Sequence, residues 1–162
     1  PFLGSIFEDK YKSLAILATV SLLNLSILEG QKITGLYKSS FELIDIISSK
    51  NKWLNDYCKW LFILLKQIGY EVNYEKNKNL KYFNLDKNDF ENDNLSNNII
   101  TFPHEMLNKS IKINYIDVNA IFLIFENIYI KNHLNNYYNY KMPIHYTKFK
   151  NVVLNRIKNS NV

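Results

Sequence analysis

Residues that break helices and build turns are scarce in this chain, which has only four glycines and three prolines among its 162 residues. A β-sandwich or barrel needs many tight turns, and those turns draw heavily on glycine and proline. Because 47% of the residues are hydrophobic, the chain can bury a core and is not expected to be disordered. We therefore expect residues 1–162 to form a single, mostly α, compact domain built like a helical bundle.

The clearest helical pattern lies between Lys52 and Ile68. Apolar side chains recur there at three- and four-residue steps, the spacing that places them on one face of a helix. They are Leu54, Tyr57, Leu61, Leu64 and Ile68. Asn51 is a plausible N-cap, and Gly69 is a residue type that commonly ends helices. The pattern predicts an amphipathic helix over these residues.

Two further helices are expected before this one, over Ser13–Glu29 and Leu36–Ile47. The first is apolar on nearly every side and is followed by Gly30, which predicts a central, buried helix. Its richest part, Leu14–Leu28, is interrupted by polar residues and is shorter than the ~20 apolar residues of a transmembrane span. The sequence favours a buried helix over a membrane one.

After residue 70 the pattern changes. Residues 71–98 are rich in Asn, Lys and Asp, which predicts a polar, irregular insert, and residues 80–83 and 99–102 are expected to pair as a small hairpin. Pro103 suits the first turn of a short helix. Asp117 is expected to cap a long helix that ends near Leu134, and Pro143 is expected to open a last helix.

The residues that enzymes use do not form a recognisable cluster in this sequence. His104, His133 and His145 are widely spaced, the glycines form no phosphate-binding loop, and Cys58 lies inside a predicted helix. A single cysteine also excludes an internal disulfide and a cysteine-cluster zinc site, which weakly favours the cytoplasm. The start at Pro1 lacks the features of a signal peptide and reads like a chain cut from a longer one. We expect no enzyme chemistry and no cofactor.

Positive charge is concentrated in the last part of the chain. Residues 101–162 carry eight Lys or Arg against three acids, and no acid follows Glu126. Cations neutralise phosphates and aromatic faces stack on bases, so this mixture is typical of contact with single-stranded nucleic acid. The candidate DNA-binding residues are Lys131, Lys141, Lys148, Lys150 and Arg156, and the aromatic residues among them include Tyr129, Tyr146 and Phe149. A charged terminal face that is merely solvated is the alternative.

Four segments, in order, resemble the α-helical domain of the RecO family of bacterial recombination and repair mediators. The most informative is Tyr57–Tyr70, where relatives have an aromatic residue or Leu, then a basic residue, Leu-Leu and Leu-Gly-aromatic at similar spacing. The others are Leu3–Asp9, Glu29 with Leu36–Phe41, and Phe125–His133 with Met142–Phe149. The resemblance spans nearly the whole chain, whereas the OB fold that precedes this domain in the family does not occur in these residues.

This resemblance implies a non-enzymatic mediator. It would bind single-stranded DNA, anneal strands, engage the acidic-hydrophobic tail of the single-stranded DNA-binding protein SSB, and work with RecR to load RecA in the cytoplasm, at the nucleoid during repair. Lys59 and Ile63 fall on the helix that resembles the one with the tail pocket. A cation beside an apolar notch suits a hydrophobic residue with a free carboxylate. The alternative is a solvated Lys59 and a core Ile63.

The chain departs from the family at several positions. Residues 71–93 hold no Cys where many relatives have a cysteine cluster, so no metal role is expected. Leu61 stands where the family usually has Glu, and Cys58 and Tyr146 stand where some members have Arg. Two other classes remain open: a helical protein-interaction or structural domain with an incidental basic tail, and a module that lies on a membrane surface.

The dispersed histidines and the lack of a cysteine cluster make a prediction about metal. We expect no stoichiometric zinc, and no loss of helical structure on addition of a chelator, because no ligand set links metal binding to folding. Elemental analysis and circular dichroism with and without chelator measure both. One zinc per chain would contradict this prediction.

Overall fold

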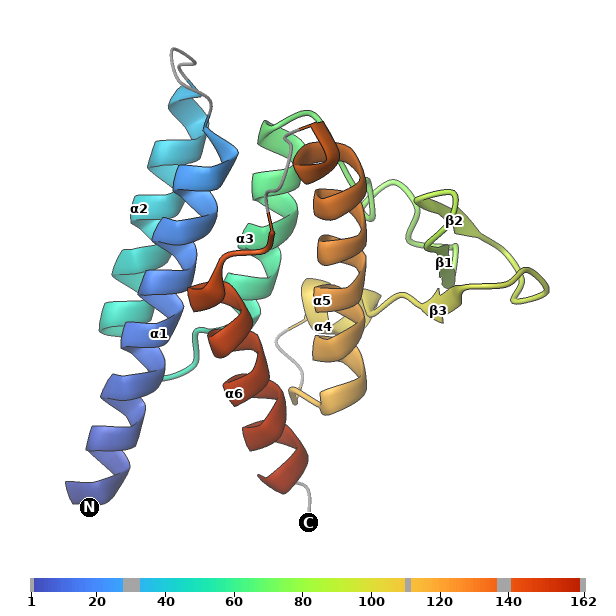
Figure 1. The fold of residues 1–162 in the computed structure, drawn as a ribbon. Coiled ribbons are helices and arrows are strands. Elements are labelled where there is room, and N and C mark those ends of the chain that lie inside the picture. Colours follow the sequence, from blue (N-terminus) through green and yellow to red (C-terminus); the bar gives the residue numbers. More distant parts are fainter. Residues whose placement is uncertain (1, 28–32, 110–111, 137–140, 161–162) are drawn as a thin grey trace.

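The computed structural model describes residues 2–27, 33–109, 112–136 and 141–160 (Figure 1). Its long helices are α1 (Phe2–Ser26), α2 (Thr34–Ser49), α3 (Leu54–Gln67), α5 (Tyr115–Ile128) and α6 (Ile144–Ser160). Helix α1 packs against α2, α2 against α3, α3 against α5, α5 against α6, and α6 against α1. These five contacts close a ring around one core, so the predicted mostly α bundle is confirmed.

A small antiparallel sheet projects from one side of the bundle, away from α1 and α2 (Figure 1). Its strands are β1 (Tyr82–Asn84), β2 (Asp89–Glu91) and β3 (Ile99–Thr101), in the order β2-β1-β3. The predicted pairing of residues 80–83 with 99–102 is confirmed, with Phe83 opposite Ile100. The short helix α4 (His104–Asn108) follows β3, and Pro103 precedes it as the N-cap.

Several predicted helix boundaries are wrong. Helix α1 begins at Phe2 instead of Ser13. Helix α3 begins at Leu54 with Trp53 as its N-cap, so Asn51 lies outside it. Helix α5 is capped by Asn114, whose side-chain oxygen accepts the backbone N–H of Asp117 at 2.9 Å. Asp117 therefore belongs to the first turn, where its negative charge interacts favourably with the positive end of the helix dipole.

The helix predicted to run to Leu134 changes its winding after Ile128. A π-helical turn, η1 (Tyr129–His133), and a 3-10 turn, η2 (Leu134–Asn136), follow α5. The side chains of Tyr129 and His133 meet the end of α1, the first at Ser26 Oγ (2.8 Å) and the second at the Leu25 carbonyl (2.9 Å). The predicted stop at Gly30 lies outside the described residues. Gly69 ends α3 as predicted, with a φ of 101° in the left-handed region.

Helix α1 is less central than predicted. One face is buried through Ala15, Ala18 and Leu22, whereas Leu17 and Val20 on the opposite face are 45% and 39% exposed. Among the described residues no helix is long and apolar enough to cross a membrane. This helix, apolar on nearly every side, therefore buries one face fully and leaves part of the opposite face exposed.

Aromatic side chains fill the core where α3, α5 and α6 meet. Phe149 is fully buried, and its ring centroid lies 4.6 Å from that of Tyr57 and 6.0 Å from that of Trp53. A second aromatic group anchors the sheet to α3: Phe62, Tyr74, Phe83, Phe90 and Phe102. The insert is polar at its surface, but this aromatic group holds it to the bundle.

We expect Phe149→Ala to lower the free energy of unfolding by about 3–5 kcal/mol, since it removes a buried ring from the centre of the core. For a domain of this size that loss lowers Tm by roughly 10 °C or more. Ile144→Ala, in the same helix but 66% exposed, is the matched control and should stay within about 0.5 kcal/mol of the parent. Equal Tm values for the two variants would contradict the placement of α6.

Candidate functional site

A cavity of about 790 Å³ opens at the end of the bundle where the first half of α1 lies beside the last turns of α6. The segment that joins α2 to α3 and a residue just before α5 complete its walls. Its apolar lining consists of Trp53, Leu54, Ile113, Val153 and Ile157. We call this cavity the α1/α6 cleft. Its volume lies within the ~300–1,000 Å³ typical of ligand pockets.

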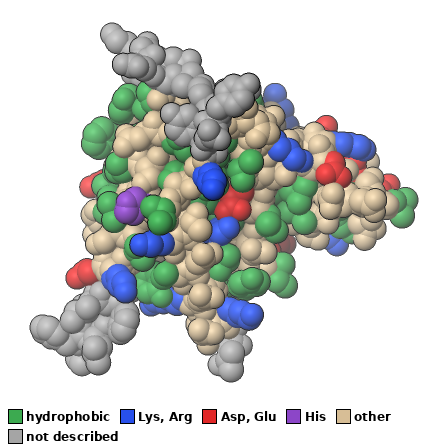
Figure 2. Space-filling model, in the orientation of Figure 1, with side chains coloured by type: hydrophobic (Ala, Val, Ile, Leu, Met, Phe, Trp, Pro, Cys, Tyr) green, Lys and Arg blue, Asp and Glu red, His purple; other side chains and the backbone are tan. Residues whose placement is uncertain are grey.

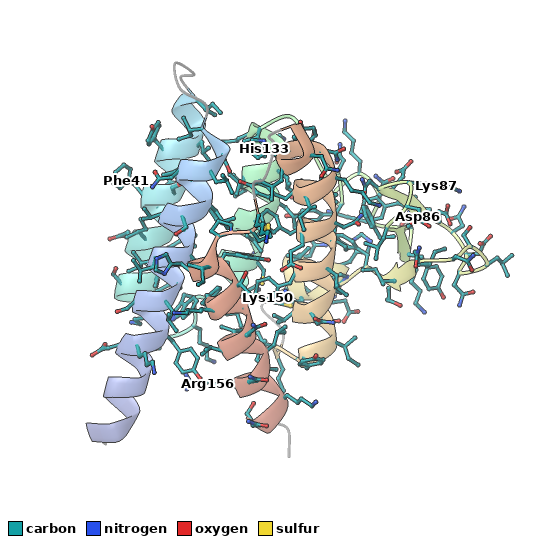
Figure 3. The ribbon with its side chains drawn as sticks, in the orientation of Figure 1. Phe41, Asp86, Lys87, His133, Lys150 and Arg156 are labelled. Carbon is teal, nitrogen blue, oxygen red and sulfur yellow. The ribbon has the colours of Figure 1, made fainter. Side chains whose placement is uncertain are left out.

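Charged side chains at the α1/α6 cleft are mostly basic. Lys12, Lys52 and Arg156 line it, and Asp9 is the one acid among the lining residues. Lys12 Nζ donates to the Ser48 carbonyl at the end of α2 (3.4 Å). The Arg156 guanidinium lies 4.3 Å from the centre of the Tyr11 ring, in the region between α6 and α1 (Figure 3). These contacts hold two of the three cations in place.

The sequence-predicted DNA-binding residues do not form one cluster. Lys141 and Lys148 are exposed, and no salt bridge or side-chain hydrogen bond is seen for them within the described residues. Lys131 donates to the Leu85 carbonyl of the insert at 2.9 Å. Lys150 donates to Glu126 on α5 at 2.6 Å, and both side chains are about four-fifths buried, at 22% and 18% exposed. Figure 2 shows Lys and Arg side chains scattered over one face of the molecule.

The aromatic partners proposed for base stacking are in the core. Tyr129, Tyr146 and Phe149 each have an exposed fraction of 0%, so they offer no face to a base, and this part of the prediction is wrong. Burial, and then the neighbouring Glu126 carboxylate, raises the pKa of Tyr146 well above its ordinary value. Tyr146 and Phe149 belong to the packed stripe of α6, an amphipathic helix, and the alternation with Lys reflects a boundary between core and solvent. Tyr137, Tyr138 and Tyr140 lie outside the described residues.

The predicted tail pocket corresponds to a second, smaller depression of about 300 Å³, on the solvent side of α3. Lys59 and Ile63 both line it, and Ile63 is 40% exposed, so neither belongs wholly to the core. Lys66, Glu71 and Glu75 also line it, and Lys66 Nζ pairs with Glu71 at 3.0 Å. Two lysines and two glutamates leave this depression electrically balanced.

The side chains that could serve in catalysis or metal binding do not gather within the described residues, and several of them are buried or hydrogen-bonded. Burial raises the pKa of the Cys58 thiol to about 12, so it stays protonated at neutral pH. His104 Nε2 lies 2.8 Å from the Leu80 carbonyl, and the buried His133 contacts α1. In the ranges that the structure describes, no three His, Cys, Asp or Glu side chains gather as metal ligands.

Comparisons of this chain with protein-family models, with curated proteins and with solved structures found no match. The resemblance to RecO therefore stays a prediction from the sequence. The α1/α6 cleft was not predicted, although its residues carry a faint signal. Lys52 precedes Trp53 in the short link before α3, where a cation adjoins a large aromatic residue.

The Lys150–Glu126 pair is expected to stabilise the contact between α6 and α5. A double-mutant cycle with Lys150→Gln and Glu126→Gln should give a coupling free energy of about 1 kcal/mol or more, because both groups are largely shielded from water. The exposed Lys38–Glu42 pair, at 4.0 Å, is the control, with an expected coupling of about 0.5 kcal/mol or less. Chemical denaturation of the parent, the four single variants and the two double variants measures both cycles, and equal couplings would contradict the prediction.

Proposed function

We propose that this chain is a non-enzymatic module that binds single-stranded DNA through its phosphates, along the solvent face of α6. The observation that carries the proposal is the charge of this part of the chain. No Asp or Glu follows Glu126 in the sequence, and the Glu126 carboxylate is already paired with Lys150. Lys141, Lys148 and Lys158 are exposed on or just before the same helix. An anion that approaches α6 therefore meets cations without competing carboxylates from that segment.

The dimensions of the helix suit a chain of phosphates. Lys148 and Lys158 are ten residues apart on α6, which places their Cα atoms roughly 15 Å apart along the axis at 1.5 Å per residue. An extended single strand spans that distance with two or three nucleotides. Because Tyr146 and Phe149 are buried, the proposal includes no base stacking by these residues. Binding should then depend weakly on base sequence and strongly on salt.

The wider role comes from the resemblance. A RecO-like domain would use DNA binding to anneal strands and to help load RecA together with RecR, and Lys59 and Ile63 would contact the SSB tail. The balanced charge around Lys59 makes an acidic tail a weak fit there unless the glutamates move away. A second candidate function is a helical protein-interaction domain. The α1/α6 cleft favours this class, because it combines apolar lining with basic side chains.

The triple variant Lys141→Gln, Lys148→Gln and Lys158→Gln should weaken binding to a single-stranded oligonucleotide. Each lost phosphate contact should flatten the slope of log affinity against log salt by about 0.7. Fluorescence anisotropy with oligo-dT and with a mixed sequence, between low and physiological salt, measures the affinity and its slope. The loss should be similar for the two oligonucleotides.

The matched control has the same change in charge at lysines that already have acidic partners. Lys38→Gln, Lys66→Gln and Lys87→Gln remove three exposed ammonium groups that pair with Glu42, Glu71 and Glu91. This control should keep most of the affinity and the salt slope. Equal losses in both triple variants, or no binding by the parent at ~0.15 M salt, would contradict the proposed interface.

A further inference from the structure

The α1/α6 cleft has the composition of a site for an amphipathic anion. Its lining is aliphatic at Leu54, Ile113 and Val153, and the basic residues Lys12, Lys52 and Arg156 stand around it with one acid, Asp9. An apolar group that enters the cleft is desolvated against this lining. A carboxylate next to that group meets a net positive charge at the edge. The same ligand therefore satisfies both parts of the cleft.

A nucleic-acid base fits the α1/α6 cleft less well. Bases bind to flat aromatic faces, but Trp53 is only 6% exposed and packs against Phe149. The guanidinium of Arg156 occupies a position over the Tyr11 ring. Leu54 and Ile113 are only partly buried, and their aliphatic surface accommodates a branched side chain better than a planar base.

We propose that the α1/α6 cleft binds an acidic peptide segment of a partner protein, with a Leu-like side chain inside the cleft and the flanking carboxylates near Lys52 and Arg156. Charge complementarity and the aliphatic lining select this occupant. The site differs from the depression at Lys59, whose glutamates oppose an acidic ligand. It is also independent of the proposed DNA interface, because Lys141, Lys148 and Lys158 do not line the cleft.

The probe is a fluorescein-labelled eight-residue peptide of six aspartates around two adjacent leucines, titrated by anisotropy with the full chain. We expect saturable binding with a Kd below ~1 mM. Replacing the leucines with serine, or the aspartates with asparagine, should each weaken binding by about tenfold or more, since each change removes one of the two interactions. Failure of the parent peptide to saturate at that concentration overturns the proposal.

Two charge variants and their neighbours locate the site. Lys52→Glu reverses a charge at the cleft and should weaken peptide binding by about tenfold. Lys50→Glu makes the same change two residues away, at an exposed position outside the cleft, and should alter it by less than about twofold. Arg156→Gln and Lys158→Gln form a second pair of the same design. Equal effects within either pair would mean nonspecific attraction and would overturn the proposal.

The apolar part of the site has its own matched pair. Ile113→Ser removes part of the aliphatic lining, whereas Ile116→Ser alters a side chain that is 75% exposed and outside the cleft. Only the first should weaken the peptide, by about fivefold. Circular dichroism melts of each variant show whether it is folded. The charge variants are all at surface positions, so they test the site even if Ile113→Ser unfolds.

Competition separates this peptide site from other occupants. A single-stranded oligonucleotide or laurate that displaces the peptide, and whose own binding falls with Lys52→Glu but not with Lys50→Glu, would assign the cleft to that ligand and overturn the peptide proposal. The triple variant of Lys141, Lys148 and Lys158 should lose DNA and keep the peptide. If the parent protein binds the peptide but not DNA, the proposed function fails and this inference stands.

Discussion

The burial of one stripe of α6 determines most of what this structure presents to solvent. Tyr146, Phe149, Val153 and Ile157 recur at three- and four-residue steps, and all four are buried against the helices around them. Once these side chains are inside, helical geometry requires the residues between them to point outward. The outward positions include Lys148, Arg156 and Lys158. The basic surface is therefore a consequence of packing, and the contact of Phe149 with Tyr57 and Trp53 holds it in place.

Periodicity in the sequence predicted that α2 and α3 are helices. Helix α2 buries one stripe, whereas α3 also buries Trp60, Phe62 and Leu65 beside its predicted stripe. The ends were harder to predict. Asp117 and Asn114 are both good capping residues, and only the folded chain shows that the Asn114 side chain accepts the Asp117 N–H. The π-helical turn after Ile128 depends on contacts of Tyr129 and His133 with Ser26 and Leu25, more than one hundred residues away. Short-range patterns in the sequence do not predict such long-range contacts.

The candidate sites show the same limit for a different reason. The α1/α6 cleft takes residues from α1, from the link before α3, from the segment before α5 and from α6, so no short motif contains it. The predicted DNA-binding residues were selected by charge, and charge alone does not distinguish Lys148, which faces solvent, from Lys150, which pairs with Glu126. The two lysines are two residues apart on one helix, and only Lys150 is within reach of the Glu126 carboxylate. Sequence composition pointed to α6 as a basic helix, and packing decides which of its lysines face solvent.

The polar insert differs in charge from the rest of the chain. Residues 71–100 carry six acids against four lysines, and the sheet that they form projects from the side of the bundle away from α1 (Figure 1). The residues that follow are basic, so the molecule has an acidic projection and a basic helical face. An extended anion is repelled by the first and attracted by the second, which favours approaches that place it on α6 or at the α1/α6 cleft. Because the aromatic group of Phe62, Phe83 and Phe102 fixes the insert to α3, this separation of charge is a fixed property of the fold. Both proposed ligands are anionic, and they are distinguished at short range: the phosphates need only exposed cations, whereas the peptide also needs an aliphatic cavity.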